Sequence, residues 1–233
     1  TTVSNALTID TSAPGTGGGN GGGENGNADG NGNQIRFDGD DIINASESTG
    51  ISISGVIESG ASLNSVVISD GTDSITIAGS SISVNPDGSY SLTGVDVSSL
   101  SDGELTVTAS ITDAAGNSGS VSDRVTLDTD AGSVSVNSLS TNDTTPALSG
   151  SVSDPDASVT VRVNGQDYSA TNNGDGSWSL ADDSLSALSA GSYDVTVTAT
   201  DAAGNQNSTT VSNALTIDTS APGTGGGNGG GEN

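Results

Sequence analysis

The sequence of 233 residues contains no cysteine, no histidine and no lysine. The absence of cysteine excludes disulfides, thiolate metal sites and cysteine nucleophiles. Without histidine, a Ser-His-Asp triad, histidine zinc ligands and the usual proton shuttle are excluded. The absence of lysine excludes Schiff-base chemistry and Lys–Asn isopeptide crosslinks. No apolar run approaches the roughly 18 residues of a membrane-spanning helix, so direct membrane insertion is not expected.

Aromatic residues make up only 2% of the chain and hydrophobic residues 30%. This is little for one large core but enough for two small β-sandwiches. Charge is one-sided, because 29 acidic residues accompany three basic ones and give a net charge of −26. A compact chain with that charge repels itself, so we expect cations to screen or bind the carboxylates. Nucleic acid and anionic membranes are poor partners for a chain without a basic patch.

The chain repeats itself on two scales. One segment recurs unchanged at 1–25 and 209–233, an offset of 208 residues. A second, divergent repeat has an offset of 88: Asn85-Pro-Asp-Gly-Ser-Tyr matches Asn173-Gly-Asp-Gly-Ser-Trp, and Asp113-Ala-Ala-Gly-Asn matches Asp201-Ala-Ala-Gly-Asn. Internal repetition of this kind is typical of arrays of related domains.

The repeats predict the domain boundaries. The predicted segments are an orphan last strand at 1–11, a Gly-rich linker at 12–33, one domain at 34–130, a second domain at 131–220 and another Gly-rich linker at 221–233. The linkers contain too little apolar area to fold and are expected to be flexible.

Each domain is predicted to be all-β. Residues 159–163 and 194–199 alternate apolar and polar side chains, and turn signals such as Asn164-Gly recur at short spacing. About seven short strands in about 90 residues indicate an immunoglobulin-like Greek-key β-sandwich. In the second domain the expected strands are 132–138, 147–153, 158–164, 166–171, 177–181, 193–200 and 209–218. The sequence therefore predicts two tandem sandwiches, joined by a short acidic linker.

Acidic residues fall where loops of such sandwiches meet. The loop after the second strand and the loop between the last two strands lie at the end where the chain enters. Together with the linker, these loops of the second domain contain Asp128, Asp130, Asp154, Asp156, Asp201 and Asn205. Ca²⁺ takes six to eight oxygen ligands and relieves the repulsion of gathered carboxylates. We predict several calcium ions, mainly at the junction between the domains; the alternative is that each Asp only forms a turn.

The leading end of the first domain repeats this pattern less clearly. The candidate ligands there are Asp40, Asp41, Glu58, Asp113 and Asn117. In the linker, Asn27-Ala-Asp-Gly-Asn-Gly followed by Asp38 fits the spacing of an EF-hand loop. Chance matches are common in a tract rich in Gly, Asn and Asp, and no flanking helices are evident.

Several motifs together resemble a known family. They are Asp-Asp-Ile-Ile-Asn-Ala at 40–45, the two Asp-Ala-Ala-Gly-Asn loops, Asn-Gly-Asp-Gly-Ser-Trp-Ser-Leu at 173–180 and the closing Leu-Thr-Ile-Asp-Thr-Ser-Ala-Pro. Over nearly all of 34–220, the chain resembles the bacterial Ig-like extender repeats of giant RTX-type adhesins. The resemblance implies repeats that project terminal binding domains from Gram-negative cells, leave by type I secretion and hold Ca²⁺ between domains. It also implies an extracellular location, a role in attachment and biofilm formation, and Asp128, Asp130, Asp154, Asp156 and Asp201 as interdomain ligands.

The favoured hypothesis is a calcium-stabilised, monomeric stalk whose partners are neighbouring repeats, with no small-molecule substrate and no enzymatic activity. Paired carboxylates can hydrolyse glycosides, but here the paired acidic residues lie in loops, and calcium binding explains their presence there better. A carbohydrate- or surface-binding module is the alternative; it needs exposed aromatics, and all five except Tyr168 fit core positions. Ice binding through Thr196, Thr198 and Thr200 is a third hypothesis, although such threonines are ordinary on the solvent face of a sheet.

Overall fold

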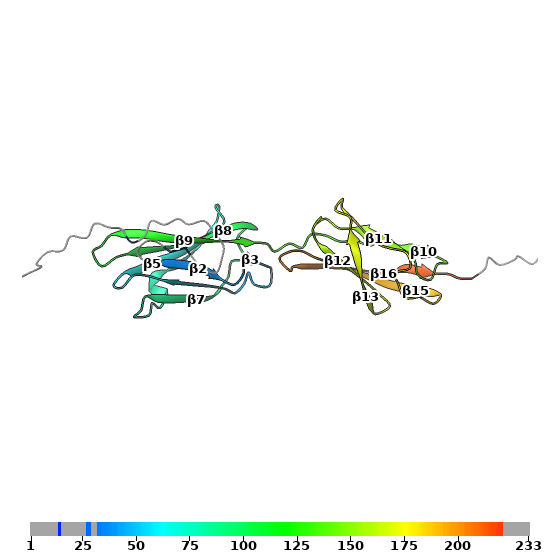
Figure 1. Cartoon of the computed structure of the whole chain (residues 1–233), viewed down its shortest axis with the longest axis horizontal. Coiled ribbons are helices and arrows are strands. Elements are labelled where there is room, and N and C mark those ends of the chain that lie inside the picture. Colours follow the sequence, from blue (N-terminus) through cyan, green and yellow to red (C-terminus); the bar gives the residue numbers. More distant parts are fainter. Residues whose placement is uncertain (1–13, 15–26, 29–31, 221–233) are drawn as a thin grey trace, which may run out of the picture. The chain divides into compact units, whose positions relative to one another are not determined.

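The computed structural model describes residue 14, residues 27–28 and residues 32–220 (Figure 1). The chain divides into two compact units, the first ending at Asp130 and the second beginning at Ala131. The orphan strand expected at 1–11, most of the linker expected at 12–33 and the linker expected at 221–233 lie outside the described residues. No helix in the described part of the chain has the length and apolar character needed to cross a membrane.

Unit 1 consists of two β-sheets that face each other across one core. Its elements are β1 (Asn27–Ala28), β2 (Gln34–Asp38), β3 (Ile42–Ile43), β4 (Ile51–Val56), β5 (Ser62–Ser69), β6 (Ser74–Ala78), the 3-10 helix η1 (Gly79–Ser81), β7 (Ser89–Val95), β8 (Gly103–Thr112) and β9 (Ser118–Leu127). One sheet has the order β1-β2-β4-β7 and the other the order β3-β9-β8-β5-β6. Neighbouring strands are antiparallel except β3, which pairs with the end of β9 in parallel.

Alternation along the strands builds this core. In β8, Leu105, Val107, Ala109 and Ile111 are each fully buried, and the Thr and Ser residues between them are partly exposed. Each completely buried Val, Leu or Ile contributes about 1.5–3 kcal/mol relative to an exposed one. A period of two therefore directs one face of the strand to the core and the other to water.

Unit 2 repeats the architecture with one joined sheet. Its strands are β10 (Leu139–Thr141), β11 (Leu148–Ser151), β12 (Ser158–Val163), β13 (Gln166–Asn172), β14 (Ser177–Leu180), β15 (Gly191–Thr200) and β16 (Gln206–Ile217). Their order is β10-β16-β15-β12-β13-β14-β11. β13 pairs with β12 along its first part and with β14 at its end, so it connects the two layers.

The predicted all-β sandwich fold is confirmed, with one difference near the start of unit 2. Residues expected at 132–138 as the first strand form only an isolated bridge between Val134 and Val152, with the amide of Ser135 donating to the carbonyl of Ser151 at 2.9 Å. β10, which was not expected, follows directly and pairs in parallel with the end of β16. A three-residue strand whose only partner is distant in sequence leaves no periodic signal.

The aromatic residues belong to the cores. Tyr90 and Trp178, matched by the internal repeat, are 2% and 0% exposed. The partly buried Phe37 packs against the core of unit 1, and Tyr168 and Tyr193 pack against the core of unit 2. The expectation that Tyr168 alone lies outside a core is therefore wrong. Its hydroxyl is held in place by donating to Gln166 Oε1 at 2.8 Å.

Candidate functional site

Two acidic loops lie side by side at the end of unit 2 where the chain enters. Ser158 pairs with Thr200, so the loop before β12 adjoins the loop after β15. The chain arrives at the same end, because the amide of Ser133 donates to Ser153 Oγ at 2.7 Å. The sheet register therefore brings together three segments of unit 2 that are remote in sequence.

The carboxylates of these loops are engaged within their own turns. Asp201 Oδ1 accepts from the amide of Asn205 and Oδ2 accepts from Asn205 Nδ2, both at 2.8 Å. Gly204 closes this turn with φ of +86°, a conformation that glycine adopts without steric cost. In the other loop, Asp154 Oδ1 accepts from the amide of Asp156 at 2.9 Å. Turn stabilisation, the alternative to calcium binding, therefore accounts for the local geometry of both loops.

The matching loops of unit 1 have the same construction. Asp113 Oδ1 accepts from the amide of Asn117 and Oδ2 accepts from Asn117 Nδ2, both at 2.7 Å. The side-chain bond from Asn117 is the main cause that holds the pKa of Asp113 below its ordinary value of 3.8. Glu58 lies in the neighbouring loop before β5, where its amide donates to Oδ1 of the buried Asn33 at 2.7 Å. These loops meet at the end of unit 1 where β2 begins.

Asp40 and Asp41 lie at the opposite end of unit 1. β2 runs antiparallel to β4 with Asp38 opposite Ser52, and the two acidic residues follow that end of β2. The amide of Thr126, near the end of β9, donates to the carbonyl of Asp41 at 3.0 Å. Their expected grouping with the leading-end loops of the first domain is therefore wrong, because the whole length of β2 separates the two places.

Asp128 and Asp130 lie at this same end, where the chain leaves unit 1. The amide of Asp130 donates to Asp128 Oδ1 at 3.4 Å. Between them, Thr129 Oγ1 donates to Asp102 Oδ1 at 2.9 Å. Sequence reasoning missed Asp102 as a neighbour of Asp128. An Asp-Gly turn at Asp102 was visible in the sequence, but its position depends on the register of β8 against β9.

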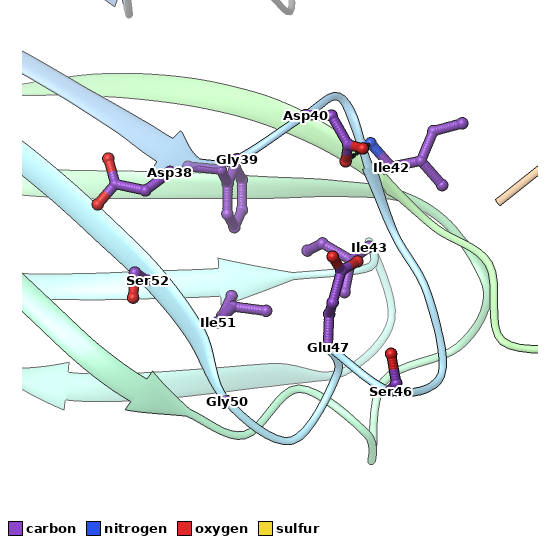
Figure 2. Close-up of a pocket in the computed structure, with 11 residues that line it drawn as sticks. Asp38, Gly39, Asp40, Ile42, Ile43, Ser46, Glu47, Gly50, Ile51 and Ser52 are labelled. Carbon is purple, nitrogen blue, oxygen red and sulfur yellow. Dashed lines mark hydrogen bonds between the residues drawn. The ribbon is translucent and has the colours of Figure 1, made fainter. Parts of the chain in front are cut away.

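A pocket of about 570 Å³ lies beside these residues, within unit 1. Figure 2 shows Asp40 and Glu47 around the apolar Ile43 and Ile51, with the carboxylate of Asp38 directed away from them. The hydrogen bonds that the carboxylates accept come from Ser54 Oγ to Asp38 (2.6 Å), from the amide of Ile42 to Asp40 (3.3 Å) and from the amide of Asn44 to Glu47 (3.0 Å). The carboxylates of Asp40 and Glu47 therefore order their own turns, and that of Asp38 bonds to the neighbouring strand β4.

The donor chemistry fits calcium, but neither unit gathers a complete site. Among residues 14, 27–28 and 32–220, no three acidic side chains lie close enough together to hold a metal ion. The carboxylate and amide oxygens of the loops are the hard ligands that Ca²⁺ prefers. A hydrogen-bonded carboxylate oxygen also retains a second lone pair. The loops of one unit therefore supply only some of the oxygen ligands that a calcium ion needs.

The first and last positions of the EF-hand spacing, Asn27 and Asp38, lie in the paired strands β1 and β2. Asn27 pairs with Ile35 in a β-ladder, and the chain stays extended from there to Asp38. Asp38 forms an ion pair with Arg36 at 3.3 Å. Asp29 and Asn31, the middle positions, lie outside the described residues.

Residues 124–219 match the family of bacterial Ig-like domains. The expected relation to bacterial Ig-like repeats is thereby confirmed. No curated protein is significantly similar to the chain in sequence.

Three solved structures of adhesins are similar to the chain. One is a Ca²⁺-stabilised adhesin that helps an Antarctic bacterium reach out and bind ice (29% identity, 80% of this chain, 49% of that chain, TM-score 0.43). Another is a tetra-tandem repeat from the extending region of a large adhesion protein (32%, 79%, 48%, TM-score 0.35). The third is a 1.5-MDa bacterial ice-binding adhesin (27%, 80%, 64%, TM-score 0.40). The chain thus spans about half the length of the first two and 64% of the third.

Proposed function

We propose that the chain is a calcium-stabilised extender module of a large secreted bacterial surface adhesin. In that role it projects terminal adhesive domains from the cell for attachment and biofilm formation. Its partners are neighbouring repeats of the same protein, and calcium outside the cell is the ion that stabilises it. The proposed role is structural rather than enzymatic, and it agrees with a sequence that lacks the histidine, cysteine and lysine side chains used by many catalytic sites.

The observation that carries the proposal is that each unit takes in the chain at one end and releases it at the other. In unit 2 the incoming Gly132 accepts from Asn207 Nδ2 at 2.6 Å, and the outgoing Asp218 donates from its amide to the carbonyl of Thr141 at 2.8 Å. β16 connects these ends with 12 residues, about 40 Å of extended chain. A unit built in this way adds length to an array.

Charge supports the role of calcium. All three arginines are already used in exposed ion pairs: Arg36 with Asp38, Arg124 with Glu104 and Arg162 with Asp167. Such pairs contribute little to stability. With 29 acidic residues in the chain, most carboxylates must be balanced by ions from solution.

The proposed ligands lie at both ends of unit 1 and at the end of unit 2 where the chain enters. They are Asp128, Asp130, Asp154, Asp156, Asp201 and Asn205, with Glu58, Asp113 and Asn117 as a second set at the leading end of unit 1. Asp40, Asp41 and Asp102 are added as proposed ligands at the end of unit 1 that carries Asp128: there Asp41 accepts from the amide of Thr126, and Asp102 accepts from Thr129 Oγ1. Backbone carbonyls and water would complete the six to eight oxygens that calcium requires.

Thermal unfolding with calcium or with EDTA tests this proposal. Extracellular calcium sites bind with dissociation constants of about 10⁻⁴–10⁻³ M. An ion at about 100 times its dissociation constant adds about 2.7 kcal/mol per site. We expect EDTA to lower the melting temperature by about 10 °C or more and to reduce the maximum dimension measured by small-angle X-ray scattering. An unchanged melting temperature and an unchanged dimension in EDTA would refute the proposal.

Single substitutions show which carboxylates cause the calcium-dependent part of the stability. Asp201→Asn and Asp128→Asn each remove one proposed ligand, and both are expected to reduce the calcium-dependent part of the stability. Asp167→Asn removes the same charge from β13, where the carboxylate is paired with Arg162, and serves as the control. Equal calcium dependence in all three variants would assign the effect to general screening of the negative charge.

A further inference from the structure

Among the strands that the structure describes, β6 is an open edge of unit 1. It is the last strand in the order β3-β9-β8-β5-β6, and it pairs with β5 through five residues without a register shift. Its sequence, Ser-Ile-Thr-Ile-Ala, contains no charged residue, no proline and no bulge. Natural proteins usually protect edge strands with these features, and an unprotected edge is a template for another strand.

Unit 2 protects the same position. There β13 continues past β12 and pairs with β14 through Thr171 and Asn172, so the two layers are joined. On the remaining part of β13, Asp167 places a charge that is bound by Arg162 at 2.9 Å. In unit 1, η1 follows β6 and leads the chain away before any such pairing. The open edge is therefore a property of one unit and not of the fold.

The edge is held in place from its own unit. In the turn before β6, Asp70 Oδ1 accepts from the amides of Thr72 (2.8 Å) and Asp73 (2.7 Å), and Oδ2 accepts from the amide of Ser101 (2.8 Å). These bonds lower the pKa of Asp70 to about 2, and the bond from the amide of Ser101 contributes most. The turn therefore keeps its charge and its shape at neutral pH. Behind the strand, Ile75 and Ile77 pack against the core. A preformed edge loses little entropy when it binds.

The hydrogen-bonding groups of β6 alternate between its two sides. The amide of Asp70 donates to the carbonyl of Asp73, which fixes the phase of the ladder. By antiparallel alternation, Ile75 and Ile77 exchange their bonds with β5. The amide and carbonyl groups of Ser74, Thr76 and Ala78 then point to the open edge, and their side chains are exposed.

We propose that β6 pairs with β6 of a second copy of this chain, antiparallel and centred on Thr76. This register places Ser74 opposite Ala78, Ile75 opposite Ile77 and Thr76 opposite Thr76 of the second copy. The outward groups form about six backbone hydrogen bonds. Because the contact uses the same strand twice, it is two-fold symmetric and closes on itself.

Charge does not oppose this register locally. The nearest acidic residue in sequence, Asp73, would lie opposite Gly79 of the second copy. The two Asp73 side chains are then separated by about six residues, or about 20 Å. This exceeds the Debye length of about 8 Å at physiological ionic strength. The net charge of −26 still repels at longer range, so the pairing strengthens as salt is added.

The contact is small, and repetition compensates for this. A five-residue edge buries less area than the roughly 1,200–2,000 Å² of a stable complex, so one pair of chains associates weakly. The exact recurrence of residues 1–25 at 209–233 indicates an array with an offset of 208 residues. The strands of unit 1 run between its two ends, so antiparallel pairing of β6 places the two arrays side by side in opposite directions. Several β6 edges on such a pair of arrays bind together far more strongly than one. The inferred role is lateral association of stalks that run in opposite directions, which goes beyond the proposed extender function and does not depend on calcium ligands.

Disulfide trapping tests both the contact and its register. The chain contains no cysteine, so a single Thr76→Cys variant reports on this position alone. Directly paired residues have Cα atoms about 5.5 Å apart, within the range of a disulfide. The Ser74→Cys control lies on the same exposed strand, but its two copies would be about 13 Å apart. We expect Thr76→Cys to form covalent dimers about ten times faster than Ser74→Cys, and faster in 0.5 M than in 0.02 M NaCl; equal rates in the two variants would overturn the proposal.

A second variant measures association without a crosslink. Thr76→Lys places a charge on the edge but makes the chain less negative, so weaker association of this variant cannot result from greater repulsion. Sedimentation velocity of the full chain at high concentration should show less dimer for Thr76→Lys than for the wild type. Thr108→Lys, with the same substitution on the outer face of the central strand β8, should retain the wild-type level. A Thr76→Lys variant that dimerises like the wild type would contradict pairing at β6. EDTA should leave the difference in dimer content between Thr76→Lys and the wild type unchanged, whether or not calcium stabilises the units.

Discussion

In unit 2, β13 crosses from one layer to the other and pairs with β14, whereas in unit 1 the layers stay separate on that side. The connecting residues explain the difference. In unit 2 the short turn 173–176 leads directly from β13 into β14, and in unit 1 the longer segment 79–88 detours through η1. Divergent repeats can therefore keep the same kind of core and still present different edges. The length of one connection determines which strand edges stay available to other chains.

The two units agree in how they fasten the first segment to the core. Trp178 Nε1 donates to the carbonyl of Ser135 at 2.7 Å, and the hydroxyl of Tyr90 donates to the carbonyl of Gln34 at 3.3 Å. Each aromatic ring thus reaches the segment that begins its unit. The bond is shorter in unit 2, where that segment forms only an isolated bridge instead of a regular ladder.

Removing the two aromatic side chains should have the largest effect. Trp178→Ala should lower the free energy of unfolding of unit 2 by about 3–5 kcal/mol, because it leaves a large cavity and an unpaired carbonyl. Tyr90→Ala should have an effect of similar size on unit 1. Urea denaturation followed by circular dichroism is expected to show two transitions, with one shifted in each variant. If either substitution shifts both transitions equally, the units do not unfold separately.

The glycine beneath the Trp178 ring gives a second comparison, with a glycine of unit 1 that has no such neighbour. A Cβ on Gly150 would lie 1.9 Å from the carbonyl oxygen of Ser135 and 2.6 Å from Trp178 Nε1. The obstacle is backbone and cannot rotate away, so Gly150→Ala should cost about 1–3 kcal/mol. Gly50 has open space around it and ordinary backbone geometry, and Gly50→Ala should leave stability nearly unchanged. The denaturation midpoints of the two variants provide the measurement; a neutral Gly150→Ala would show that the first segment of unit 2 moves freely.

Much of the fold of each unit could be predicted from the sequence. The offset of 88 matched Tyr90 with Trp178, and both are buried and bonded in the same way. The strand expected at 158–164 is observed as Ser158–Val163, because its alternation is regular. Local periodicity and repetition carry this information in the sequence.

The ends of the units could not be predicted. The position of Asp41 beside the end of β9 depends on the parallel pairing of the two-residue strand β3, and that of Asp102 depends on the register of β8. Such pairings join residues that are far apart in sequence through very few contacts. The loops that carry the candidate ligands were therefore visible as motifs, while their neighbours became known only from the structure.

The smallest expected effect concerns Asp182, which lies in unit 2 and has Gly94 at the matching position of unit 1. Loss of solvation is the main cause that raises the pKa of Asp182 above its ordinary 3.8. The negative charge of the nearby Asp143 and its hydrogen bond to Asp182 raise this pKa further. A raised pKa in the folded state means that the contribution of Asp182 to stability is present below about pH 3.8 and is lost as the pH rises through its folded value. Asp182→Asn should therefore raise the melting temperature at pH 7, by about 2 °C or less, and leave it unchanged at pH 3.

Asp175 supplies the control of opposite sign for this last comparison. The side chain of Ser177, and then its amide, donate to Asp175 Oδ1 at 2.6 and 3.1 Å and lower the pKa of that carboxylate. Its stabilising contribution is present above pH 3.8 and is lost as the pH falls through the lowered value. Asp175→Asn should thus lower the melting temperature at pH 7, although it removes the same negative charge as Asp182→Asn. If both variants stabilise the chain at pH 7, relief of the net charge outweighs the local partners, and the specific role of Asp143 beside Asp182 is contradicted.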